Sequence, residues 1–152
     1  KKGKKHVLRI IRELINFKPK HKQTDLNNAL VYLNNILKKK SIVFLMSDFI
    51  DQNYEKNINI TSKKHDLIGI HVVDPFEKKI KNIGFSLFFD SENNNHFWVD
   101  TSSKSVRGKI EKEYKLYVDY FKKSFQKNGA DTISIMTDES YIIKLLNFFK
   151  KR

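Results

Sequence analysis

Hydrophobic residues follow two different patterns along the chain. In some segments they recur every three or four positions, which predicts amphipathic helices; these segments are 7–17, 26–37, 106–125 and 142–149. In others they form short uninterrupted runs, which predict strands buried on both faces of a parallel sheet; these runs are Ser41–Ser47, Asp66–Val73 and Asp131–Met136. A weaker pattern predicts one more helix over Tyr54–Lys64.

Polar residues and helix breakers set the boundaries of these elements. Pro19 ends the first helix, because the residue before a proline avoids the helical region. Thr24 and Asp25 open the second helix as its cap and first-turn acid. Residues 84–89 and 97–99 flank the polar stretch Asn93–Asn95, which predicts a β-hairpin.

The strands alternate with helices, so the predicted fold is a Rossmann-like, doubly wound α/β domain with a parallel sheet and an inserted β-hairpin. Ligands of such sheets bind outside the carboxyl ends of the strands. Asp48, Asp74 and Thr137 each follow a predicted strand. These residues therefore point to one rim of the sheet as the functional site.

The composition changes this picture little. The 152 residues carry a formal net charge of +13, and they contain no cysteine, which excludes disulfides and a thiolate zinc site. Most of the positive charge lies in residues 1–40, but it comes mainly from lysine, which we interpret as a solvated basic face. No apolar stretch approaches the roughly 20 residues of a membrane span. We expect a cytoplasmic protein whose segment here does not bind a membrane.

Two short motifs carry the candidate chemistry. Residues 24–30 (TDLNNAL) place a threonine before an Ala-Leu pair, and residues 42–48 (IVFLMSD) place an aspartate after an apolar strand. Both resemble parts of the metal-ion-dependent adhesion site of von Willebrand factor A domains. The resemblance implies that Thr24 and Asp48 bind Mg²⁺ in the intact protein. Asp25 and Asp51 are then candidates to support these ligands, although both also suit helix-cap and turn positions.

A longer resemblance covers almost the whole chain. Its phrases, in order, are HVLRIIREL, TDLNNAL, KKKSIVFLMSDFID, KKHDLIGIHVVDP, VDTSS and TDESYIIKLLNFFKKR. They resemble the C-terminal half of the bacterial domain-of-unknown-function family 58, which is von Willebrand A-like and encoded beside MoxR-type AAA+ ATPases. The resemblance implies one partial domain over residues 1–152, without its N-terminal strands and first metal loop, and a parent protein with a membrane anchor.

The resemblance departs from the family pattern at the first metal loop. No D-x-S-x-S motif is present, and the nearest string, Asp100–Lys104, has lysine at its last position. We therefore expect an incomplete Mg²⁺ site that binds no ion in this chain. The strand 41–47 would also present an apolar edge, which favours self-association.

The sequence favours a non-enzymatic protein-interaction module that acts with a MoxR-type ATPase. One alternative is a Mg²⁺-dependent phosphoesterase or nuclease using Asp48, Asp51 and Asp74, although no nucleophile or base is paired with them. Another is a nucleic-acid-binding domain, which we expect less because arginine is scarce; its basic residues would be Lys1–Lys5, Arg9, Arg12, Lys18, Lys20 and Lys22. The aromatic residues of the predicted hairpin fit a strand face, and an exposed half of them would form a partner-binding surface.

Overall fold

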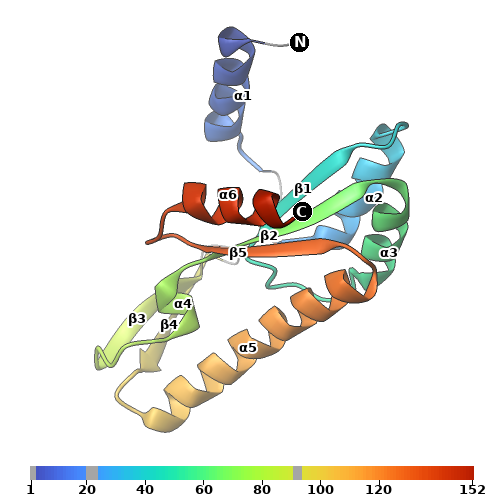
Figure 1. Ribbon diagram of the computed structural model, residues 1–152. Helices are drawn as coiled ribbons and strands as arrows, with labels where there is room; N and C mark the ends of the chain where they lie inside the picture. The colour runs from blue at the N-terminus through green and yellow to red at the C-terminus, as the bar shows by residue number, and fades with distance from the viewer. Residues whose placement is uncertain (1–2, 20–23, 91–93) are drawn as a thin grey trace.

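The computed structural model describes residues 3–19, 24–90 and 94–152. Its centre is a parallel three-stranded sheet in the order β1-β2-β5, as the alternating pattern predicts (Figure 1). The strands are β1 (Ile42–Ser47), β2 (Asp66–Val73) and β5 (Asp131–Met136). The architecture is α/β and consistent with a Rossmann-like fold.

Helices cover both faces of this sheet. One face packs against α2 (Leu26–Ile36), α3 (Glu55–Lys64) and α5 (Lys104–Lys127), and the larger core lies there around Leu30, Phe121 and Phe125. On the other face, α6 (Tyr141–Lys151) packs over β2 and β5 through Leu145 and Phe148. The helical spacing of 142–149 predicts this helix with Ile142, Leu145, Leu146 and Phe149 facing inward, and of these Leu145 packs on the sheet whereas the other three are exposed. The periodicity therefore predicted the helix but only part of its buried face.

The close contact between β2 and α5 depends on Gly69. A Cβ atom at this position would lie 2.6 Å from Phe125 Cε1 and 2.7 Å from Phe121 Cε2. Both rings are fully buried, so they have no room to move away. The glycine therefore sets the distance between the sheet and its longest helix.

Strand β1 corrects one prediction, because it is not buried on both faces. It lies at the edge of the sheet, where Val43 faces the core but Ile42, Phe44 and Met46 are exposed. The apolar run predicted the strand, but α6 packs mainly on β2 and β5 and reaches β1 only where the Phe149 ring meets Phe44 edge-on, at a centroid distance of 6.2 Å. The expected apolar edge is therefore present.

A two-stranded antiparallel hairpin lies below the carboxyl ends of the sheet strands (Figure 1). It consists of β3 (Phe85–Asp90) and β4 (Asn95–Asp100), and the first part of its predicted tip lies outside the described residues. The short helix α4 (Pro75–Lys78) precedes it and begins at Asp74, whose side chain accepts a 2.8 Å hydrogen bond from Phe76 N. Asp74 thus caps a helix rather than ending the strand as a simple turn.

The first helix, α1 (Lys4–Asn16), stands apart from the other elements (Figure 1). It has the predicted apolar face, but none of its residues is buried. Among the described residues, no helix has both the length and the apolar character needed to cross a bilayer.

Candidate functional site at the carboxyl ends of the strands

Asp48 directly follows β1 and lies at the predicted rim. Its Oδ1 accepts hydrogen bonds from Ser47 Oγ (3.1 Å) and from Ile50 N (3.2 Å). These contacts hold the carboxylate in the tight turn that leaves the strand. Part of its hydrogen-bonding capacity is therefore used to stabilise its own loop.

The next residue, Phe49, fixes this loop against the core. Its backbone φ is 56°, a left-handed conformation that is costly for a bulky side chain. Its ring is fully buried and stacks on Phe121 at a centroid distance of 4.0 Å. Burial of the ring offsets the backbone strain, so Asp48 is held at a defined position on the rim.

Asp51 joins this loop to the start of α2. Its Oδ2 accepts a 2.8 Å hydrogen bond from Leu26 N, one of the helix amides that lack an intrahelical partner. The structure thus brings the segment of Thr24 and Asp25 to the end of β1, as the two motifs together predict. Asp25, rather than Thr24, is the N-cap, because its Oδ1 accepts a 2.8 Å hydrogen bond from Asn28 N.

The predicted metal site does not have the ligands that Mg²⁺ needs. Among residues 3–19, 24–90 and 94–152, no group of three or more His, Asp or Glu side chains is placed to bind an ion. Thr24 and Asp48 supply two oxygen donors, whereas Mg²⁺ prefers six-fold coordination. The string 100–104 does not replace the missing loop, since Asp100 binds Ser102 N and Ser103 caps α5. Thr24 and Asp48 alone do not fit a resident metal ion.

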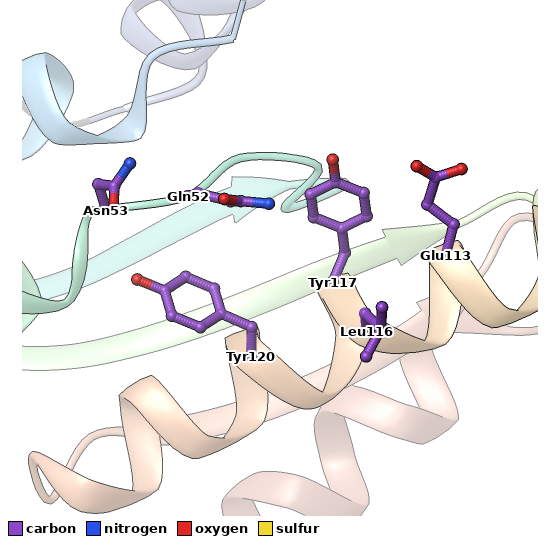
Figure 2. Close-up of a pocket in the computed structure, with 6 residues that line it drawn as sticks. All are labelled: Gln52, Asn53, Glu113, Leu116, Tyr117 and Tyr120. Carbon is purple, nitrogen blue, oxygen red and sulfur yellow. The ribbon is translucent and has the colours of Figure 1, made fainter.

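Two adjoining pockets form a groove along α5, which the sequence did not predict. The first has a volume of about 360 Å³ and lies between α5 and the loop after β1 (Figure 2). The second, of about 620 Å³, continues between α5, α4 and the hairpin and shares Glu113 and Tyr117 with the first. We call the whole feature the α5 groove. In Figure 2, Tyr117 and Glu113 project from the helix toward the loop that carries Gln52.

The two pockets of the α5 groove differ in their lining, because Gln52, Asn53 and Glu113 contribute to the first and mainly apolar side chains to the second. Its larger pocket is lined by apolar and aromatic side chains that include Phe76, Phe88 and Tyr114. Glu77, Asp90 and Glu113 line it as well. Burial raises the pKa of Glu77, and the nearby carboxylates of Asp48 and Asp74 raise it further. The carboxylates at the rim therefore act on an acidic side chain of the groove, in a chain that is strongly basic overall.

The hairpin has two faces of different exposure. On one face, Phe88 packs near Phe76 and lines the α5 groove. On the other, Phe85, Leu87, Phe89 and Trp98 are all exposed. Phe85 and Trp98 stack in parallel with ring centroids 4.9 Å apart. These four side chains form what we call the hairpin aromatic face.

Sequence reasoning located some of this site and missed the rest. The strand-end acids were found because a buried strand is easily recognised, and the hairpin aromatics were found from their density. The acidic and aromatic residues of the groove, such as Glu77, Glu113 and Tyr117, were missed. They come from two helices far apart in the chain, and their only signal was the spacing of Ile110, Glu113 and Tyr117 along one side of α5.

Comparisons with known proteins place the chain among proteins of unknown activity. Residues 1–117 match the family described as "Protein of unknown function DUF58". The chain is 22% identical over 131 residues to the uncharacterized protein MAV169 of Mycobacterium avium, a match that covers 84% of this chain and 76% of that protein. No solved structure matches the chain.

Proposed function

The chain belongs to the DUF58 family of proteins of unknown function, and from that premise we propose that it is a non-enzymatic protein-interaction module. Its binding surface comprises the hairpin aromatic face, the α5 groove and the rim of the sheet at Asp48. In this proposal the fold holds the surface rigid, and no chemical step takes place on it.

The hairpin aromatic face is the observation that carries the proposal. Trp98 is 61% exposed and Phe85 is 67% exposed, although both are large apolar residues. Contiguous apolar patches on a soluble surface mark binding sites for other molecules. Tryptophan is also among the residues that contribute most to protein–protein affinity. The hairpin therefore offers an anchor that a partner would desolvate.

The α5 groove supports the same reading. The aromatic side chains of its larger pocket favour an apolar side chain of a partner, and the carboxyl groups of Glu77 and Glu113 in the same lining favour a positive charge beside it. The partner surface that fits is therefore an apolar anchor flanked by lysine or arginine. The resemblance to von Willebrand A-like proteins encoded with MoxR-type ATPases suggests that the partner is such an ATPase.

A titration of the chain into a purified MoxR-type ATPase tests the proposal. We expect saturable binding that weakens by about 30-fold or more in Trp98→Ala, since truncating an aromatic anchor costs about 2 kcal/mol or more. Tyr32→Ala provides a matched control, because Tyr32 is an equally exposed aromatic residue on α2. The absence of binding, or equal losses in the two variants, would contradict the proposal.

A metal-dependent phosphoesterase using Asp48, Asp51 and Asp74 is the second candidate, because Asp48 and Asp74 both follow sheet strands, although no group of three or more His, Asp or Glu side chains among the described residues is placed to bind an ion. Turnover of a generic phosphoester with Mg²⁺, abolished by Asp48→Ala, would support this enzyme and overturn the proposed function. The third candidate is nucleic-acid binding through the basic face of α1. It requires binding that weakens steeply as salt increases.

The affinity of the rim of the sheet for Mg²⁺ gives a separate prediction. Two oxygen donors do not hold the ion, so calorimetric titration of Mg²⁺ into the chain is expected to show no saturable binding below about 1 mM. Asp48→Ala should give the same trace as the unaltered chain. Saturable binding that disappears in Asp48→Ala would show that the rim holds a complete site.

A further inference from the structure

A pocket of about 350 Å³ lies at the amino ends of β1 and β2, at the opposite end of the sheet from the rim. It is lined by the last turn of α2, by residues 37–40 of the loop that follows, and by Lys64 and His65 at the end of α3. These two segments are joined where Asp66 N donates a 2.9 Å hydrogen bond to Ser41 O. The pocket, which we call the lysine pocket, is therefore built between paired segments of the described chain.

The lining of the lysine pocket is strongly positive. Four of its seven lining residues are lysines, namely Lys38, Lys39, Lys40 and Lys64, and no acidic residue of the described chain lines it. None of these lysines forms an ion pair with another described residue. Asp66, the acid that follows in the sequence, is paired with Arg152 instead. The four ammonium groups thus face the pocket region without a neutralising partner.

The ends of α2 and α3 account for only part of this charge. A helix C-terminus is equivalent to about half a negative charge, and lysines often complement it. Because two helices end at the pocket, together they offset about one of the four lysine charges. The remaining positive charge is concentrated around a concave site, where a field of one sign attracts ligands of the opposite sign.

The buried side chain of His65 gives a second, independent indication of a ligand. It is only 3% exposed, and neither Nδ1 nor Nε2 has a hydrogen-bond partner among the described residues. Asn34 lines the same pocket, and its buried Oδ1 is unpaired as well. Buried polar groups are normally hydrogen-bonded, because burial removes their hydration. A polar ligand in the pocket would satisfy these atoms.

We propose that the lysine pocket binds a small molecule that carries phosphate groups. The phosphate oxygens would accept hydrogen bonds from the lysine ammonium groups and from an N–H of His65, while Asn34 Oδ1 would accept one from a ligand hydroxyl group. A water molecule occupies roughly 30 Å³ in the liquid, so the pocket has room for a ligand larger than a single phosphate. A nucleic acid would instead need a groove that follows its backbone.

Calorimetric titration of inorganic pyrophosphate into the full chain tests the proposal. We expect saturable binding that weakens about tenfold or more in Lys39→Gln/Lys64→Gln, because two charge-assisted contacts are lost. Lys150→Gln/Lys151→Gln is the matched control, since it removes the same charge from the last turn of α6 and leaves the pocket lining intact. The absence of saturable binding, or equal losses in the two double variants, would overturn the proposal.

A change at His65 separates a binding role from a structural one. His65→Phe removes both ring nitrogens and keeps an aromatic ring. Because neither nitrogen is paired within the described chain, the urea midpoint should change little, whereas the affinity for pyrophosphate should fall about tenfold. Unchanged affinity in the folded variant would place the phosphate groups outside the lysine pocket and overturn the proposal.

A short single-stranded RNA is the third probe, because lysine clusters also attract nucleic-acid backbones. We expect only weak, salt-dependent RNA binding that falls equally in the two double variants. Tight RNA binding that depends on Lys39 and Lys64, in a chain that does not bind pyrophosphate, would identify a nucleic-acid surface and overturn the proposal.

Discussion

At the scale of single residues, the packing of the core depends on a few positions where the size of the side chain is critical. Gly69 is the clearest case, because its missing side chain is the space that the Phe121 and Phe125 rings occupy. Phe49 is the reverse case, in which a large ring is retained despite an unfavourable backbone conformation. Both residues act on the same aromatic cluster between β2 and α5. The position of Asp48 at the rim depends on that cluster.

Gly69→Ala is therefore expected to lower the free energy of unfolding by about 1–3 kcal/mol or more, since the added methyl group overlaps two buried rings. Gly108→Ala is the matched control. Gly108 lies inside α5 with no atom within 4 Å of an added Cβ, so alanine should stabilise the helix by about 0.5–1 kcal/mol. Urea denaturation of the two variants measures both changes. Equal effects of the same sign would contradict this account of the packing.

His71 makes the stability of the fold depend on pH. Its ring is buried near Phe49 and Phe121, and burial lowers its pKa, with Lys122 acting in the same direction and Asp48 against it. Below about pH 6.5 the unfolded chain binds a proton that the folded chain resists, so acid favours unfolding. We expect the urea midpoint to fall between pH 7.5 and 5.5, and to fall less in His71→Gln.

His96→Gln controls for this measurement, because His96 lies on the exposed side of the hairpin. The urea midpoint of His96→Gln should therefore change with pH as much as that of the unaltered chain. If the two histidine variants respond alike to pH, burial of His71 is not the cause of the acid sensitivity.

At the scale of the elements, hydrophobic patterns predicted where helices and strands lie better than what covers them. Asp66–Val73 is a strand over the predicted range, because a short apolar run bounded by polar residues fits few structures other than a buried strand. The run at β1 predicted a strand equally well but suggested two buried faces. Whether a face is covered depends on the placement of α6, which no local pattern encodes. The α5 groove was missed for the same reason.

Helix α1 shows most clearly that a hydrophobic pattern can predict a helix without predicting what covers its apolar face. It also gives a prediction. Its apolar face is strongly patterned, yet Leu14 and Ile15 contact no core and are more than 70% exposed. Leu14→Lys should therefore change the free energy of unfolding by no more than about 0.5 kcal/mol. Phe121→Ala, in the buried cluster, should cost about 3–5 kcal/mol. A large loss of stability in Leu14→Lys would show that α1 packs on the domain.

At the scale of the whole molecule, the candidate partner-binding surfaces lie at one end of the sheet. The hairpin lies beside the carboxyl ends of the sheet strands (Figure 1); one of its faces lines the α5 groove through Phe88 and Phe97, and the other carries the hairpin aromatic face. The rim could be predicted from the sequence because strand order dictates it, whereas the groove required the full structure.

Hydrogen exchange of the chain, free and saturated with a MoxR-type ATPase, tests the central claim most directly. The account predicts that the ATPase slows amide exchange in β3, β4 and the part of α5 that lines the groove, and leaves α2 and α3 unchanged. Slower exchange confined to α1 or α2, or no change at saturation, would contradict the claim that this chain binds its partner through the hairpin and the groove.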